Sequence, residues 1–255
     1  MLSASTRTRS GRMQQRAFVT FGPDVPTRAD NLRLEVVHGM TWLVRAQDNF
    51  GEVHLQRMMP AEALRIRGQH NALNALAALA LALAAGCTLA PMLHALREYR
   101  GEPHRMQSVG IVDGVEYFND SKGTNVGATV AALVGLGAQQ RVVVILGGEG
   151  KGQDFTPLAE PVRRFARAAV LIGRDAGAIR AALGDTGVEL VEAGSMDAAV
   201  DAARTRARAG DAVLLSPACA SFDMFRNYPH RGEVFCASVA RLAEQSGTSL
   251  EGAGA

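Results

Sequence analysis

Short, strongly apolar runs alternate with helix-like stretches from about residue 103 onward, and this alternation constrains the fold more than any other feature. The run at residues 141–146 is apolar at every position after its first, as expected for a strand buried on both faces of a sheet. Further strand-like runs occupy residues 109–112, 115–118, 169–172, 188–191 and 212–215. Helices are predicted at residues 127–136, 158–168, 176–183, 196–209 and 230–245. Strands that alternate with helices predict an α/β domain with a mostly parallel sheet.

The preceding part of the chain has a different pattern, in which short alternating runs are separated by Gly, Pro, Asp and Asn. These runs, typical of antiparallel strands and turns, lie at residues 18–21, 32–36, 41–44 and 53–55. Two helices are predicted next, at residues 70–85 and 89–99, and Gly101 and Pro103 then mark a domain boundary. The expected segments are a disordered N-terminus at residues 1–16, domains at residues 17–101 and 102–246, and a disordered tail at residues 247–255.

Composition narrows the class of protein. The chain has 47% hydrophobic residues, 20% charged residues and a net charge of +2, so we expect a soluble globular protein that binds no nucleic acid. Residues 71–93 carry no charge, but Gly86 and Pro91 divide them, which favours two packed helices over a membrane span. Three widely spaced cysteines indicate free thiols in a cytoplasmic protein. The six histidines show no metal-ligand spacing, so we expect no metal site in this chain.

Three polar loops follow predicted strands, at residues 119–125, 147–154 and 216–221. Two of them hold the only lysines of the chain, Lys122 and Lys151, although the sequence has 27 basic residues. Ligands of parallel sheets bind beyond the carboxyl ends of the strands, where helix N-termini also favour anions. The loops therefore predict a site for phosphates or carboxylates, with ordinary turn and cap chemistry as the alternative.

Neither familiar nucleotide-binding motif is complete in the glycine-rich loop. A Walker A loop requires Gly where Ile145 stands, and Ser or Thr where Gly152 stands. A dinucleotide fingerprint requires a third Gly where Gln153 stands, which disfavours an oxidoreductase domain. Cys219 follows a strand without an assignable histidine partner, so a small buried residue is the better interpretation.

The combined loops resemble a known family. The segments Asn119-Asp-Ser-Lys-x-Thr-Asn125, Leu146-Gly-Gly-x-Gly-Lys151 and Leu215-Ser-Pro-Ala-Cys-Ala-Ser221 are similar to the C-terminal half of the D-glutamate-adding Mur ligases, the UDP-N-acetylmuramoyl-L-alanine:D-glutamate ligases of peptidoglycan synthesis. The similarity runs from about residue 18 to residue 242 and includes residues 68–79 and 103–106. The Asp-Asn-Pro-Arg motif of diaminopimelate-adding ligases is absent, which favours D-glutamate. Departures are mild: the family often has Ala at Gly123, Asp at Glu149 and Phe at Tyr228.

This resemblance implies an ATP-dependent reaction in the cytoplasm. ATP phosphorylates the carboxylate of UDP-N-acetylmuramoyl-L-alanine, D-glutamate attacks the acyl phosphate, and the tetrahedral intermediate collapses to amide and phosphate. Lys122 is then expected to steady developing negative charge, with Asp120 as the second catalytic residue. The residues expected to face ATP are Asn71, Asn74, Arg105 and Asp120. Those expected to hold the carboxylates of D-glutamate are Thr124, Lys151, Ser221, Phe222 and Tyr228.

Structural roles remain alternatives for several of these residues. Asn71 and Asn74 could cap a helix or form hydrogen bonds in the core. Arg105 and Asp120 could form a salt bridge with each other. Thr124 and Ser221 could each cap the N-terminus of a helix.

The resemblance also implies what lies upstream in the family. Residues 17–101 would be the last part of a central ATPase domain, and residues 102–246 a Rossmann-like, amino-acid-binding domain. The phosphate loop, the Mg²⁺ ligands and a UDP-binding domain would precede them. We therefore expect a fragment, or a gene model that starts late, and a monomer without ligase activity of its own. The alternative is a non-catalytic Rossmann-like module that binds an amino acid or a nucleotide. Translation of the DNA upstream of Met1 discriminates them, because an in-frame loop ending in Gly-Lys-Thr or Gly-Lys-Ser indicates a truncated ligase.

Overall fold

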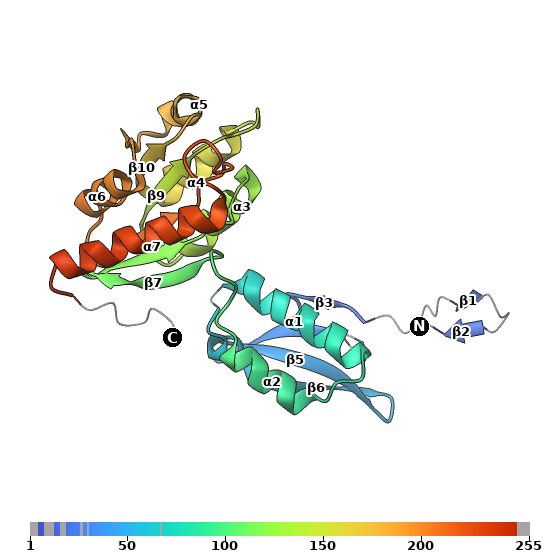
Figure 1. Cartoon of the computed structure of the whole chain (residues 1–255). Helices are drawn as coiled ribbons and strands as arrows, with labels where there is room; N and C mark the ends of the chain where they lie inside the picture. The colour runs from blue at the N-terminus through green and yellow to red at the C-terminus, as the bar shows by residue number, and fades with distance from the viewer. Residues whose placement is uncertain are drawn as a thin grey trace. The chain divides into compact units, whose positions relative to one another are not determined.

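The computed structural model describes residues 5–7, 13–15, 19–25, 28–29, 31–66 and 68–248, and it divides into two compact units, Met1–Arg100 and Gly101–Ala255 (Figure 1). Much of the predicted disordered N-terminus, and the tail from residue 249 onward, lie outside the described residues. Two short strands within the N-terminus, β1 (Ser5–Arg7) and β2 (Met13–Gln15), pair antiparallel, where the sequence pattern predicts no element.

The first unit contains a four-stranded sheet in the order β3-β4-β5-β6. Its strands are β3 (Phe21–Gly22), β4 (Leu32–Val37), β5 (Met40–Asn49) and β6 (Glu52–Pro60). The last three strands pair antiparallel, as predicted. β3 instead pairs parallel to β4, so the prediction was wrong for this strand.

Helix α1 (Gln69–Ala84) supplies the other half of the first core. Its buried residues Ala72, Ala75, Leu76 and Leu79 follow helical spacing and pack in one cluster with the sheet. A short 3₁₀ turn, η1 (Ala61–Ala63), precedes α1, and α2 (Leu89–Glu98) follows it. The two helices end and begin around Gly86, as predicted for the uncharged stretch. Among the described helices, none combines the length and the apolarity that crossing a lipid bilayer requires.

The second unit contains a six-stranded sheet in the order β11-β10-β9-β12-β8-β7, in which only β7 runs antiparallel. The strands are β7 (Gln107–Val112), β8 (Val115–Asn119), β9 (Val142–Gly147), β10 (Ala166–Ile172), β11 (Glu189–Glu192) and β12 (Ala212–Leu215). Asp113 and Gly114 join β7 to β8, both with positive φ (51° and 76°), as a tight hairpin with a type I′ turn requires. The predicted mostly parallel α/β domain is confirmed.

The helices of this unit are α3 (Val126–Gly137), α4 (Ala159–Phe165), α5 (Ala176–Leu183), α6 (Met196–Arg206) and α7 (Tyr228–Gln245), with 3₁₀ turns η2 (Thr156–Leu158) and η3 (Gly184–Thr186). The helix predicted at residues 158–168 is too long, because its last residues begin β10. Ala168 and Ala169 are buried there between neighbouring strands. Alanine-rich sequence suits both states, so tertiary packing decides the boundary.

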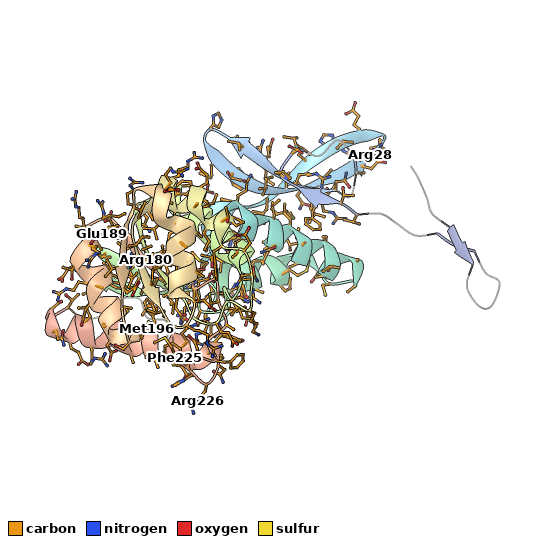
Figure 2. The ribbon with its side chains drawn as sticks, turned by 90° about the horizontal axis from the view of Figure 1, so that it is seen from above. Arg28, Arg180, Glu189, Met196, Phe225 and Arg226 are labelled. Carbon is orange, nitrogen blue, oxygen red and sulfur yellow. The ribbon has the colours of Figure 1, made fainter. Side chains whose placement is uncertain are left out.

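Both faces of this sheet are covered. Val142, Val144 and Leu146 pack in one core with α3, α4 and α5, whereas Val143 and Ile145 pack in a second core with α6 and α7. Met196 of α6 lies in the second core, and Phe225 packs against that core from the loop before α7 (Figure 2). The continuous apolar run of β9 is explained by this burial on both faces.

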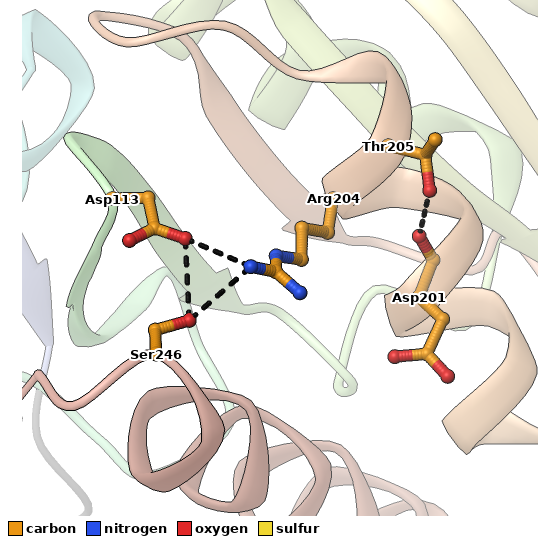
Figure 3. Close-up of polar contacts among 5 residues, drawn as sticks. All are labelled: Asp113, Asp201, Arg204, Thr205 and Ser246. Atoms are coloured by element: carbon orange, nitrogen blue, oxygen red, sulfur yellow. Dashed lines mark hydrogen bonds and ion pairs between the residues drawn. The ribbon is translucent and has the colours of Figure 1, made fainter.

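A polar cluster closes the edge of the sheet at which β8 begins. Arg204 donates from Nη2 to Asp113 Oδ2 (3.1 Å) and to Ser246 Oγ (3.3 Å), and Ser246 Oγ donates to the same Asp113 oxygen (3.2 Å; Figure 3). The Thr205 hydroxyl donates to the Asp201 carbonyl (2.7 Å) within α6. The cluster joins the β7–β8 turn, α6 and the residue that follows α7.

Candidate functional site

Three polar loops leave the sheet side by side at the carboxyl ends of its central strands. β12 lies between β8 and β9, and Leu215 pairs with both Asn119 and Ile145. The loop after β12 is further tied to the other two, because the Ala218 amide donates to the Gly123 carbonyl (2.9 Å) and the Ala220 amide to the Glu149 carbonyl (2.9 Å). The prediction that the three loops share one edge of the sheet is confirmed.

Asp120 organises the loop after β8. Its Oδ2 accepts from Ser216 Oγ (2.7 Å) and its Oδ1 accepts from the Met106 amide (3.2 Å), so both carboxylate oxygens are engaged. A Cβ atom on Gly123 would lie 2.6 Å from Asp120 Oδ2 and 2.7 Å from Ser216 Oγ. The absence of a side chain at Gly123 therefore makes room for the Asp120–Ser216 hydrogen bond.

The Asp120 carboxyl is 7% exposed, and this burial raises its pKa to about 6, against the smaller opposing effects of Ser216, Met106 and Arg105. Desolvation disfavours the charged form of a carboxylate. Arg105 is exposed and forms no ion pair within 4.0 Å among the described residues. Arg105 and Asp120 therefore do not form the direct salt bridge that was the structural alternative for this pair. The positive charge of Arg105 favours the ionised form of Asp120 and so lowers its pKa slightly. Asp120 in turn accepts a hydrogen bond from the amide of Met106, the residue that follows Arg105.

The two lysines lie in different surroundings. Lys122 Nζ lies 4.0 Å from the centroid of the Tyr228 ring, a cation–π contact, and the edge of His104 faces the same ring at 6.0 Å. Lys151 Nζ lies 5.7 Å from the centroid of the exposed Phe222 ring. The backbone of Lys151 has φ 53°, in the left-handed region that non-glycine residues rarely adopt. Such strained positions cluster at functional sites.

The hydroxyls of Thr124 and Ser221 are available for a ligand. α3 is capped by Asn125, whose side chain accepts from the Ala128 amide (2.9 Å), and α7 is capped by Asn227. The alternative that Thr124 and Ser221 are helix caps is therefore wrong. Neither hydroxyl forms a side-chain hydrogen bond to another described residue; Thr124 is half-buried and Ser221 is 2% exposed.

Asn71 and Asn74 lie one turn apart on α1, in the first unit, and Asn74 Nδ2 lies 3.5 Å from Asn71 Oδ1. The N-cap of α1 is Gly68, so neither asparagine caps the helix. Asn74 is exposed and Asn71 is half-buried, which leaves the Asn74 amide accessible. The other predicted site residues all lie in the second unit.

Arg231, which the sequence analysis missed, is the largest fully buried side chain among the described residues. From the first turn of α7 its guanidinium donates to Ser121 Oγ (3.0 Å), to the Ser121 carbonyl (2.8 Å) and to the Cys219 carbonyl (3.0 Å). It thus fastens the loop after β8 to the loop after β12. Burial lowers the pKa of Arg231 to about 10, so it stays charged at neutral pH. Nothing in the sequence distinguishes this arginine from the many others.

Cys219 itself is buried, as the sequence analysis expected, and burial raises the pKa of its thiol to about 12. A protonated, buried thiol is a poor nucleophile. Among the residues that the structure describes, no three His, Cys, Asp or Glu side chains are grouped so that they could hold a metal ion. The three loops at the carboxyl ends of β8, β9 and β12 therefore offer ammonium groups, hydroxyls and backbone amides. These groups suit the binding of anions and the stabilisation of negative charge.

The glycine-rich loop after β9 is held from three sides. Asp175 Oδ2 accepts from the Gly150 amide (2.6 Å), and Arg174 Nη1 lies 3.2 Å from Glu149 Oε1. The Gln153 side chain bonds to both neighbouring loops. A Cβ atom on Gly148 would lie 2.2 Å from the Ala220 carbonyl oxygen, so glycine is required for this close approach.

Comparison with known proteins shows what this chain is similar to. Residues 104–219 match the family described as Mur ligase, glutamate ligase domain. The chain is 61% identical over 263 residues to the UDP-N-acetylmuramoylalanine--D-glutamate ligase of Albidiferax ferrireducens, a match that covers 99% of this chain and 52% of that protein. It is 56% identical over 251 residues to the ligase of the same name from Ralstonia nicotianae, covering 91% of this chain and 50% of that protein. The chain thus spans about half the length of the curated relatives it matches.

Solved structures share the fold at lower identity. The UDP-N-acetylmuramate-alanine ligase of Thermotoga maritima superposes with a TM-score of 0.60 at 20% identity, covering 89% of this chain and 48% of that one. The folylpolyglutamate synthase of Mycobacterium tuberculosis gives a TM-score of 0.58 at 16% identity, covering 82% and 47%. Both similarities concern the fold alone.

Proposed function

We propose that this chain, which is similar to D-glutamate-adding Mur ligases over nearly its whole length, forms the D-glutamate-binding half of an ATP-dependent UDP-N-acetylmuramoyl-L-alanine:D-glutamate ligase of peptidoglycan synthesis. The observation that carries the proposal is the meeting of both lysine loops with the Ser221 loop at one edge of the sheet. A reaction between an acyl phosphate and an amino acid brings several negative charges together, and these loops offer ammonium groups and hydroxyls for them. The substrates, the cytoplasmic location and a monomeric state belong to this proposal.

Lys122 is proposed to stabilise the charge that develops as phosphate leaves. Tyr228 steadies its ammonium through the 4.0 Å cation–π contact. Arg105, exposed and free to meet an anion, is proposed to face a phosphate of ATP. Asp120 is buried with both oxygens engaged, so we propose that it acts by holding the segment that carries Arg105 and by attracting the Arg105 guanidinium through its charge.

Lys151, Thr124 and Ser221 are proposed to hold the two carboxylates of D-glutamate. The support is that both hydroxyls lack partners among the described residues and that Lys151 is exposed beside Phe222. The Phe222 backbone is proposed to contribute to holding these carboxylates, with Tyr228 nearby.

Asn71 and Asn74 are proposed to face the base of ATP, because they share one side of α1 and Asn74 is exposed. Amide side chains offer the donor and acceptor pair that reads a purine edge. ATP binding also requires Mg²⁺ ligands, and the described residues contain no cluster that fits them. We assign no step to Mg²⁺ in this chain.

The proposal is tested with a hybrid ligase, in which this chain replaces the matching part of the Albidiferax ferrireducens enzyme. We expect the hybrid ligase to release phosphate from ATP only when both UDP-N-acetylmuramoyl-L-alanine and D-glutamate are present. The 255-residue chain alone should release none, because its sequence contains no Walker A loop. An inactive hybrid that still binds D-glutamate in calorimetry would favour the alternative of a non-catalytic binding module.

Replacement of Lys151 by arginine tests the amino-acid role of this lysine. The planar guanidinium cannot replace a compact ammonium in a tight loop, so we expect the KM for D-glutamate to rise by about tenfold or more. The KM for ATP should stay within about twofold, since Lys151 is proposed to contact only the amino acid. Steady-state kinetics of the hybrid ligase measure both values. Equal increases for the two substrates would contradict the role.

A further inference from the structure

We propose that Gln153 is a positioning residue that sets the spacing of the D-glutamate-binding side chains, an inference that rests on the proposed function. Its Nε2 donates to the Ala218 carbonyl (2.7 Å), and its Oε1 accepts from the Val126 amide (3.1 Å). The carboxamide of Gln153, in the glycine-rich loop, therefore forms hydrogen bonds both to the loop after β12 and to Val126, where the loop after β8 enters α3.

The bonded groups are close in sequence to the three binding residues. Gln153 lies two residues after Lys151, Val126 lies two residues after Thr124, and Ala218 lies three residues before Ser221. The bridge therefore acts together with the backbone hydrogen bonds from Ala218 to Gly123 and from Ala220 to Glu149 in setting the distances between the Lys151 ammonium and the two hydroxyls. Arg231 does not replace it, because its side chain joins only the other two loops.

The chemistry of the bridge requires glutamine. Ala218 offers a carbonyl oxygen and Val126 offers an N–H group, so the side chain between them must donate on one side and accept on the other. A glutamate would keep the acceptor but would face the Ala218 carbonyl with a second oxygen. A methionine of similar shape would supply neither a strong donor nor a strong acceptor.

The Gln153 bridge also reduces the number of backbone N–H groups that the N-terminus of α3 can offer to a ligand. The Val126 N–H belongs to the first residue of α3, and the Ala128 N–H is capped by Asn125, so two of the free amides of this helix start are already used. The helix N-terminus is thus left with less capacity to bind an anion directly. Anion binding falls instead to the side chains that the bridge positions.

The experiment compares Gln153→Met, Gln153→Glu and the control Gln139→Met in the hybrid ligase. Gln139 is exposed beyond the end of α3 and has no side-chain hydrogen bond among the described residues. Loss of the bridge should raise the KM for D-glutamate by about five- to tenfold, the equivalent of about one net hydrogen bond. The KM for ATP and kcat should stay within about twofold, and Gln153→Glu should be the weaker binder of the two variants.

A KM for D-glutamate within twofold of the unmodified hybrid, or a parallel rise in the KM for ATP, would overturn the positioning role. The bridge is read independently of activity by amide hydrogen exchange at Val126 in the 255-residue chain. Faster exchange in Gln153→Met but not in Gln139→Met supports the bridge, and unchanged exchange overturns it. Failure of the proposed function would appear differently, as an unmodified hybrid ligase that releases no phosphate.

Discussion

Replacement of Lys122 by methionine is expected to lower the kcat of the hybrid ligase by about 10²- to 10³-fold, the cost of removing one preorganised group that stabilises a charged transition state. Methionine keeps most of the length and the apolar stem of lysine but loses the ammonium. Lys122 is held over the Tyr228 ring in a fixed place, so water cannot reproduce its position. The loss should appear mainly in kcat, since the charge it meets develops during reaction.

Single-turnover phosphate release measures this step without product dissociation. Tyr228→Phe is the matched control, because it keeps the aromatic face under the Lys122 ammonium, and we expect its kcat to stay within about threefold. A Lys122→Met variant that retained kcat but lost affinity for ATP would assign Lys122 to ground-state binding and would contradict the proposed role.

Replacement of Asp120 by asparagine is expected to stabilise the fold at neutral pH while it weakens the enzyme. Burial raises the pKa of Asp120 from 3.8 to about 6, so the folded chain holds this proton more tightly than the unfolded chain. The contribution of the group to stability is therefore complete below about pH 4 and is lost as the pH rises through about 6. At about 1.4 kcal/mol per pH unit, the loss amounts to about 2–3 kcal/mol.

Asparagine removes the buried charge and can keep the hydrogen bonds. Its Oδ1 can accept from the Met106 amide, and its Nδ2 can donate to Ser216 Oγ, whose own hydroxyl hydrogen can turn to Thr129 Oγ1 at 3.1 Å. We expect a gain of about 1–3 kcal/mol in the free energy of unfolding at pH 7.5 and none at pH 4. In the hybrid ligase, kcat/KM for ATP should fall about tenfold, because Arg105 loses the charge that attracts it.

Urea unfolding of the 255-residue chain between pH 4 and pH 8 measures this difference. Asp197→Asn provides the control of opposite sign. Hydrogen bonds from Ser238 and Arg241 lower the pKa of Asp197, so its contribution to stability is present at neutral pH and is lost as the pH falls. An Asp120→Asn variant that lost stability at pH 7.5 would contradict the view that burial, rather than pairing, dominates at this carboxylate.

Much of the fold could be predicted because apolar periodicity and turn chemistry agree locally. The Asp113-Gly114 pair is typical of a two-residue hairpin turn, and the continuous apolar run of β9 is typical of a strand buried on both faces. Two elements could not be predicted. The boundary of α4 and β10 lies in alanine-rich sequence that suits either state, and no local signal in the sequence indicates that β3 pairs parallel to β4.

The site was predictable in its loops but not in its supports. Strand ends and the two lone lysines marked the loops, because the carboxyl edge of a parallel sheet gathers residues that are distant in sequence. Arg231 and Gln153 hold those loops together through backbone carbonyls and amides. Their partners become neighbours only after the chain has folded, so nothing in the residue types alone indicated them.

Helix α7 begins beside the strand-end loops, at Tyr228, and finishes at the Asp113–Arg204–Ser246 cluster on the opposite edge of the sheet. Eighteen helical residues span about 27 Å at 1.5 Å per residue. A fluorophore or a surface anchor attached at the far end of α7 would therefore sit well outside the reach of a small ligand at the loops. This end of the helix offers a practical place to immobilise the second unit for binding measurements.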